Sequence, residues 1–333
     1  MFEASQLVFY YAVSPVHMGA GSAIGAIDSP IQREVHTQYP MFAGSGLKGA
    51  LRHHFNRAWP RAAGDDRKPN SLINRIFGPD TGASDFAGAL SLSDAQLVAL
   101  PIRSLKGGFA YVTSPLALAR LHRLASQANM TMPWAVPNVK ENSATTASTA
   151  LLTQRPGTQA SAAADQLVLE AFEFAAQVST DLESIADWIA THAMPDTSNK
   201  FFANKFKTDL VLLHDTDFAY FARHAMVVEP HVRINDESGT ADDGGLFYVE
   251  NLPPETLMVG LAQASIERFK KDSRHGDAAA LLSAPEVLSK VLSGAAATGD
   301  AATLAGISGK LLLLGGDATT GRGLVLVQST TAA

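Results

Sequence analysis

The chain has 333 residues, 46% of them hydrophobic and 17% charged, which excludes a disordered chain and a membrane protein. It has no cysteine, so disulfides, thiol nucleophiles, iron–sulfur clusters and Cys-ligated zinc are excluded, and any metal must be held by oxygen or histidine. The net charge is −6, but residues 1–80 contain eight Lys or Arg against six Asp or Glu, which permits a local RNA groove there.

No run of ~18 apolar residues and no basic, cleavable leader is present, so we expect the protein to stay in the cytosol. The length fits one elaborated domain, residues 1–333, with insertions.

The first predicted element is a buried strand over residues 7–13, a β-branched and aromatic run, followed by a glycine-rich loop over 19–30. A helix is expected to begin at Ser45, a good N-cap residue, and to end at Pro60. Opposite its apolar face, at i, i+4 and i+8, lie Lys48, Arg52 and Asn56.

Next come strands over 89–100 and 109–113 and a helix from Pro115 to about Ala125. Residues 126–165 are rich in Ala, Ser and Thr with scattered Pro, which predicts a surface insertion that is mobile at its tip.

The second half is expected to contain a strand over 167–174, a helix near 181–193 and another helix within 199–222. Two extended runs separated by Gly- and Asp-rich turn residues follow, so a long hairpin is predicted over 224–251.

A strand over 256–264, a helical region about 266–293 and two closing strands over 310–314 and 323–327 complete the chain. Strands mixed with helices, without strict βαβ alternation, favour an α+β fold.

The segment from Gly44 to Arg52 places glycines at a helix start and cations along one helix face. Gly44 and Gly46 would let a phosphate approach free N–H groups at the positive end of the helix dipole, and Lys48 and Arg52 would add charge. These residues therefore indicate a phosphate site, although an amphipathic helix with solvated cations explains them equally well.

The loop over residues 315–323 is rich in glycine, with Gly315, Gly316 and Gly321 beside Arg322. Its spacing is superficially that of a P-loop, but Gly-Arg-Gly stands where Gly-Lys-Ser/Thr is needed, so the Mg²⁺-binding hydroxyl is missing and an NTPase is excluded. The loop could meet a ribose-phosphate chain or another backbone segment. Taken alone, a tight hairpin turn explains it better.

Asp28 lies in the glycine-bearing loop, where a carboxylate could bind a metal or orient a nucleophile, although most loop aspartates only make Asx turns. His17 follows the first strand and could reach the same loop. A lone histidine is more often a packed or solvent-facing residue than a catalyst.

Four segments together resemble the signatures of one family, the RAMP superfamily. They are PVHMGAG (15–21), IDSPIQRE (27–34), GSGLKGALR (44–52) and GGDATTGRG (315–323). In this order they are similar to the crRNA-binding backbone subunit of the type III-B (Cmr) CRISPR effector complex, and the resemblance spans nearly the whole chain except 126–165. One departure is Gly46, where the family usually has a second serine; the backbone N–H can replace that hydroxyl.

The resemblance implies a ferredoxin-like, RRM-derived palm with helical insertions and a β-hairpin thumb, here residues 224–255. It implies four kinds of partner: crRNA, complementary target RNA, further copies of the chain in a helical filament, and other type III-B subunits. The residues implied to hold guide RNA are Gly44, Ser45, Gly46, Lys48, Arg52, Gly315, Gly316, Gly321 and Arg322.

The resemblance also implies that Asp28 promotes metal-dependent cleavage of the target beside each kink that the thumb makes. The implied cofactor is a divalent metal ion, Mg²⁺ or Mn²⁺, with Asp28 as a ligand, and His17 is a second candidate for supporting the step. This is chemically coherent, because an unstacked nucleotide can place its own 2′-hydroxyl in line with the adjacent phosphate.

Two other functions stay open. One is a structural backbone that binds guide RNA without cutting, against which an acid at position 28 argues. The other is a free-standing endoribonuclease that processes precursor RNA, a role of other RAMP proteins that usually depend on a histidine-centred site.

Overall fold

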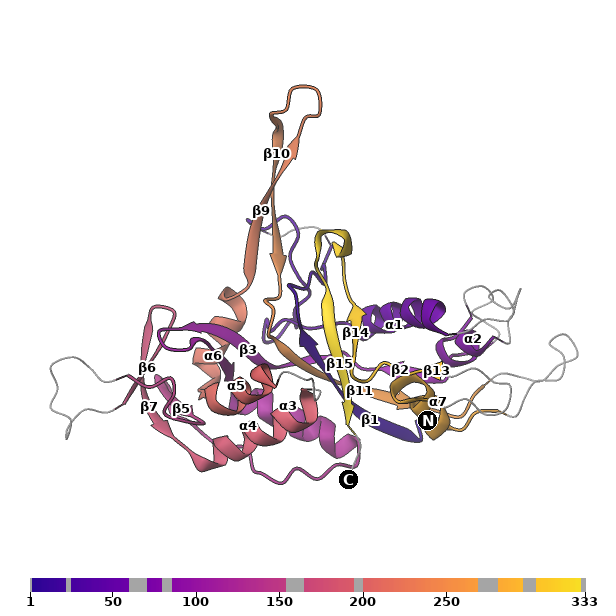
Figure 1. Ribbon diagram of the computed structural model, residues 1–333, viewed down its shortest axis with the longest axis horizontal. Helices are drawn as coiled ribbons and strands as arrows, with labels where there is room; N and C mark the ends of the chain where they lie inside the picture. Colours follow the sequence, from indigo (N-terminus) through magenta and orange to yellow (C-terminus); the bar gives the residue numbers. More distant parts are fainter. Residues whose placement is uncertain are drawn as a thin grey trace, which may run out of the picture.

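The structure is a computed structural model (Figure 1). It describes residues 2–21, 25–59, 71–79, 86–153, 165–194, 200–268, 281–295 and 304–330. None of the helices in these ranges is long and apolar enough to cross a membrane.

Helices and strands are mixed along the described chain without strict alternation. The helices are α1 (Gly44–Ala58), α2 (Leu72–Phe77), α3 (Pro115–Gln127), α4 (Thr180–Ala193), α5 (Phe201–Asp209), α6 (Asp215–His224), α7 (Ala284–Leu292) and the 3-10 turn η1 (Ala318–Thr320). The strands are β1 (Ala4–Ala12), β2 (Leu90–Leu92), β3 (Gln96–Ser104), β4 (Gly108–Thr113), β5 (Ser143–Thr146), β6 (Gln166–Leu169), β7 (Phe172–Val178), β8 (Leu210–Leu213), β9 (Val227–Ile234), β10 (Ala241–Asn251), β11 (Leu257–Ala264), β12 (Gly294–Ala295), β13 (Leu304–Ala305), β14 (Lys310–Leu313) and β15 (Leu324–Thr330).

Strand β1 lies inside the large sheet, between β11 and β15, and is antiparallel to both. Because side chains alternate along a strand, Leu7, Phe9 and Tyr11 point to one face, while Val8 and Tyr10 point to the other. The first set packs in a core with α3 and α4, and the second in a core with α1 and α7. The sheet is therefore covered by helices on both faces.

The remainder of the sheet continues from β11 in the order β3-β4-β8-β5-β7-β6, and β2 pairs with β11 beside β3. Strand β6 returns to β3 through the pairing of Ser104 with Leu169, so this end of the sheet curls round on itself.

Strands β9 and β10 form a separate antiparallel hairpin that projects from the body of the molecule (Figure 1). Its outer part is exposed, including the apolar side chains of Val232 and Leu246, whereas Val249, Glu250 and Asn251 at its base are buried. Only the base therefore contacts the rest of the protein through buried side chains.

The sequence predicted many of these elements correctly, and the mixture of helices and strands confirms the α+β class. The strand at 7–13, the helix after Pro115, the helix near 181–193 and the hairpin within 224–251 are all present.

Residues 126–165 differ from the expected surface insertion. Their described part supplies β5, which lies between β7 and β8, and the side chains of Leu151 and Leu152 are buried. Small residues predicted to be in a loop are therefore buried in and beside this strand, among them Ala144, Thr146 and Ala147. The expected tip, 154–164, lies outside the described residues.

One predicted strand was wrong in detail, because the strand at 167–174 is two strands, β6 and β7, joined by a turn in which Glu170 has φ 52°. The helix expected within 199–222 is present, and the range contains both α5 and the start of α6 with β8 between them. Of the helical region expected over 266–293, the described residues are helical over α7, and residues 269–280 lie outside the described residues.

Candidate functional site

Asp28 lies at the base of the projecting hairpin. Its carboxylate is exposed, and Oδ2 accepts a hydrogen bond of 2.8 Å from the backbone N–H of Tyr248 on β10. The next residue pairs with the same strand, because the Ser29 N–H donates to the Tyr248 carbonyl (3.1 Å) and the Glu250 N–H donates to the Ser29 carbonyl (3.0 Å). Asp28 is thus held by one oxygen, and Oδ1 accepts no hydrogen bond from the described part of the chain.

His17 also binds strand β10. Its Nδ1 lies 2.8 Å from the backbone carbonyl oxygen of Glu250. A carbonyl can only accept, so Nδ1 carries the proton in neutral His17 and Nε2 is the basic nitrogen. A Cβ at Gly19 would come within 3.0 Å of Nε2, so the absence of a side chain there keeps this nitrogen open. The structure therefore places both predicted catalytic residues against β10.

The glycine loop 315–323 is a hairpin turn packed on the His17 backbone. Gly315 has φ 84°, and a Cβ there would lie 2.2 Å from the His17 carbonyl oxygen. The Gly316 N–H donates to that same oxygen (2.9 Å). Close backbone contact thus explains Gly315 without RNA. A Cβ at Gly316 would make only ordinary contact with the His17 ring (3.5 Å), and Gly321 (φ 85°) has open space beside it. Arg322 forms an ion pair with Glu229 on β9.

The start of α1 differs from the prediction that Ser45 caps it. The helix begins at Gly44 and its N-cap is Ala43, whose side chain makes no cap bond. The Gly44 N–H instead donates to the Asp94 carboxylate (2.7 Å), a residue distant in sequence. The N–H groups of Ser45 and Gly46 lie in the first turn and have no carbonyl one turn earlier, so they remain available to an anion.

Gly46 is explained by a neighbour rather than by RNA. A Cβ at this position would come within 2.6 Å of the Met18 methyl carbon. The hydroxyl expected there would therefore require Met18 to move.

Lys48 and Arg52 are both used by the protein itself. The Lys48 ammonium donates to the Leu90 carbonyl (2.9 Å), and burial, followed by the nearby Arg52 charge, lowers the pKa of Lys48. Arg52 donates to the Gly78 carbonyl (2.5 Å) and to the Asn74 side chain (2.7 Å), which ties α1 to α2. Of these two cations, Lys48 lines the pocket of about 280 Å³ beside the start of α1 and Arg52 does not. Ser45 and Arg268 line the same pocket.

The site has few side chains that could coordinate a metal ion. Among the described residues, no three His, Asp or Glu side chains are grouped to hold a metal ion. Asp28 fits a divalent metal only as one carboxylate ligand. Mg²⁺ commonly binds in this way, with water and substrate phosphate completing the coordination.

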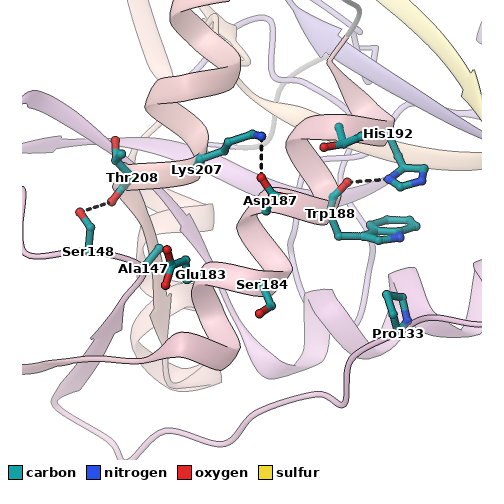
Figure 2. Close-up of a pocket in the computed structure, with 11 residues that line it drawn as sticks. Pro133, Ala147, Ser148, Glu183, Ser184, Asp187, Trp188, His192, Lys207 and Thr208 are labelled. Carbon is teal, nitrogen blue, oxygen red and sulfur yellow. Dashed lines mark hydrogen bonds and ion pairs between the residues drawn. The ribbon is translucent and has the colours of Figure 1, made fainter.

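A larger pocket, of about 600 Å³, lies beside α4 and α5, and Figure 2 shows the rings of Trp188 and His192 stacked at one side of it. Glu183 and Asp187 make its lining acidic, and Lys207 pairs with Asp187 at 2.5 Å. None of the residues that line this pocket belongs to the Asp28 loop, α1 or the hairpin, so this pocket is not part of the candidate RNA site.

Sequence reasoning missed three residues that build the site, namely Arg33, Tyr248 and Glu250. Arg33 and Glu250 form a partly buried ion pair of 2.5 Å although 217 positions separate them. The one available signal was that Arg33 lies within IDSPIQRE (27–34), one of the segments that resemble the family.

Comparison with known proteins assigns the chain to a family. The family model described as "RAMP superfamily" matches residues 9–325. The chain belongs to the RAMP superfamily. The CRISPR system Cmr endoribonuclease Cmr4 of Pyrococcus furiosus is 32% identical over 322 residues, covering 96% of this chain and 94% of the relative.

Solved structures of a Cmr4 protein and of a Cmr complex share the fold of this chain. The crystal structure of oligomeric Cmr4 from Pyrococcus furiosus covers 98% of each chain with a TM-score of 0.63 and 27% identity. A chain of the type III-B Cmr-β complex bound to cognate target RNA has a TM-score of 0.66 over 98% of each chain. Its 17% identity makes it a comparison of fold alone.

Proposed function

We propose that this RAMP protein is the crRNA-binding backbone subunit of a type III-B CRISPR ribonucleoprotein and that it cleaves complementary target RNA at regular intervals. The observation that carries the proposal is the exposed carboxylate of Asp28, fixed at the base of a projecting hairpin. The full-length similarity to a protein named as a Cmr endoribonuclease supports it.

The strand order supports a ferredoxin-like palm. Strands β15, β1, β11 and β2 are neighbours in that order and all antiparallel, and α1 and α7 follow β1 and β11 in the chain. Both helices pack in one core on the same face of β1. The β9–β10 hairpin would be the thumb, because its exposed apolar side chains suit an element that inserts between stacked bases.

Guide RNA would lie beside α1. Ser45 and Lys48 line the pocket that Arg268 also lines, and the free N–H groups of Ser45 and Gly46 lie in the first turn of the same helix. Such contacts hold phosphates without reading sequence, which base pairing with the guide supplies. Gly44 and Arg52 would position this helix, and Gly321 with Arg322 would contact RNA at the hairpin base.

Target cleavage would use the open oxygen of Asp28. A target nucleotide unstacked by the hairpin presents its 2′-hydroxyl, and Asp28 Oδ1 or His17 Nε2 accepts the proton as the 2′-oxygen bonds to phosphorus. The bond from phosphorus to the 5′-oxygen breaks, and that oxygen takes a proton from solvent. A divalent metal bound by Asp28, Mg²⁺ or Mn²⁺, would supply stabilisation of the phosphate charge.

The partners would be crRNA, target RNA, further copies of this chain and other type III-B subunits, and a cytosolic location stays a prediction. A second candidate function is a structural backbone that binds guide RNA without cutting. The hydrogen bond from Tyr248 to Asp28 favours it, since an aspartate can serve only to hold a turn.

One experiment separates the two functions. The reconstituted complex is incubated with labelled complementary RNA, with and without divalent metal, and the products are sized. Regularly spaced products that require the metal support the proposal, whereas intact RNA in a complex that binds its target supports the structural backbone.

A further inference from the structure

We infer that Arg33 is the positioning residue of the Asp28 site, and that it acts by fixing the hairpin base against the loop that carries Asp28. The inference rests on the proposed function, in which Arg33 does not contact RNA, and it gives this side chain a role.

Arg33 lies five residues after Asp28 and binds both ends of the hairpin. It pairs with Glu250 on β10 at 2.5 Å. It also donates to the Ala222 carbonyl (2.9 Å) and the Arg223 carbonyl (3.3 Å), in the last turn of α6. Because α6 leads directly into β9, one guanidinium connects the strand that enters the hairpin with the strand that leaves it.

Glu250 extends this connection to both predicted catalytic residues. One carboxylate oxygen accepts from Arg33, and the other accepts from the Ile31 N–H (3.0 Å), within the Asp28 loop. Its backbone carbonyl contacts His17 Nδ1. The Glu250 side chain is only 5% exposed, so its two oxygens depend on these protein partners.

The hairpin needs such a connection because it pairs with no strand of the large sheet among the described residues. Its direction therefore depends on contacts at its base, and Asp28 is itself held by a hairpin N–H, that of Tyr248. If the hairpin tilts, the Asp28 carboxylate and the unstacked nucleotide should lose their alignment.

An arginine is required by the geometry of these contacts. A guanidinium has five N–H donors in a fixed planar arrangement, and Arg33 uses them on a carboxylate and on carbonyls in different directions. A lysine keeps the charge and can pair with Glu250, but it cannot also reach the carbonyls of α6.

The test compares Arg33→Lys and Glu250→Gln in the reconstituted complex with guide RNA. We expect each variant to assemble and to bind target within about twofold of the wild type, and to lose about 10-fold or more in single-turnover cleavage rate. The matched control is Arg103→Lys, because Arg103 forms a similar ion pair of 2.5 Å with Glu170 but is 77% exposed and lies on β3, which does not pair with the hairpin. It should cut at the wild-type rate.

Amide hydrogen exchange of Tyr248 and Ser29 in the same complexes gives a readout independent of cutting. Exchange should be faster in both variants and unchanged in the control. Wild-type cleavage by Arg33→Lys would overturn the inference, as would slow cleavage with unchanged exchange. If the wild type itself cuts nothing, the proposed function fails, and exchange alone then decides whether Arg33 positions the Asp28 loop.

Discussion

The hairpin base and the start of α1 both contain residues predicted to contact RNA, but the protein uses them differently. At the hairpin base, Asp28 keeps one carboxylate oxygen open while its neighbours bind one another. At α1, Lys48 and Arg52 both donate to carbonyls of their own chain and Asp94 takes the first helical N–H, but Lys48 and Ser45 also line the pocket beside the helix start. A charged residue in an RNA-binding segment can therefore be structural, and each must be tested separately.

The largest expected effect is that of Asp28→Ala. It should lower the single-turnover cleavage rate by about 100-fold or more, because it removes the carboxylate proposed to bind the metal or accept the proton, while guide binding and assembly stay near normal. If Asp28 only holds a turn, unfolding should instead become easier by about 0.5–2 kcal/mol and cleavage should continue.

Shortening the hairpin tests whether its outer part kinks the RNA. Val232 and Leu246 are register partners, so an Asn-Gly dipeptide in place of residues 233–245 should close a shorter hairpin and leave its base intact. We expect a folded complex whose products lose their regular spacing. Normal spacing would mean that this hairpin is not the thumb.

Separate variants at α1 sharpen the contrast between its two cations. Lys48→Ala should weaken guide binding by about 5- to 10-fold and reduce the salt slope by about 0.7, as expected for one lost phosphate contact to single-stranded RNA. Arg52→Ala should leave that slope unchanged and cost about 1–2 kcal/mol of unfolding free energy, because it separates α1 from α2. The reverse pattern would mean that Arg52 contacts the phosphate.

The smallest expected effect concerns pH. Burial raises the pKa of Glu255 from 4.5 to about 7. The folded protein then binds more protons than the unfolded chain between these values, so this contribution to stability is complete below pH 4.5 and is lost as pH rises through about 7. Partial exposure reduces this effect of Glu255 on the unfolding free energy to about 1 kcal/mol.

Glu255→Gln should raise the melting temperature at about pH 8.5 and leave it unchanged at about pH 4. An equal change in melting temperature at both pH values would contradict the raised pKa of Glu255.

Elements with strong local signals could be predicted from the sequence. The run of apolar residues in β1, the amphipathic pattern of α1 and the turn residues of the hairpin each act over a short stretch of chain. Strands β5 and β8 could not be predicted, because four-residue strands depend on pairing with distant partners.

The same limit applied to the site. The segments containing Asp28, His17 and Lys48 were recognisable in the sequence. The contacts that place them come from Tyr248, Glu250 and other residues far along the chain, so their geometry required the structure. Ser45 shows the limit most clearly, since a good capping residue is not the cap when Asp94 takes the first N–H from outside the helix.

The central claim is tested most directly by Asp28→Asn in the fully assembled complex, in single-turnover cleavage of labelled complementary RNA. Asparagine can still accept the hydrogen bond from the Tyr248 N–H, but it is a poor metal ligand and cannot take up a proton. We predict normal assembly and target binding with cleavage reduced by about 100-fold or more. Cleavage at the full wild-type rate would contradict the catalytic role of Asp28 and leave the structural backbone as the function.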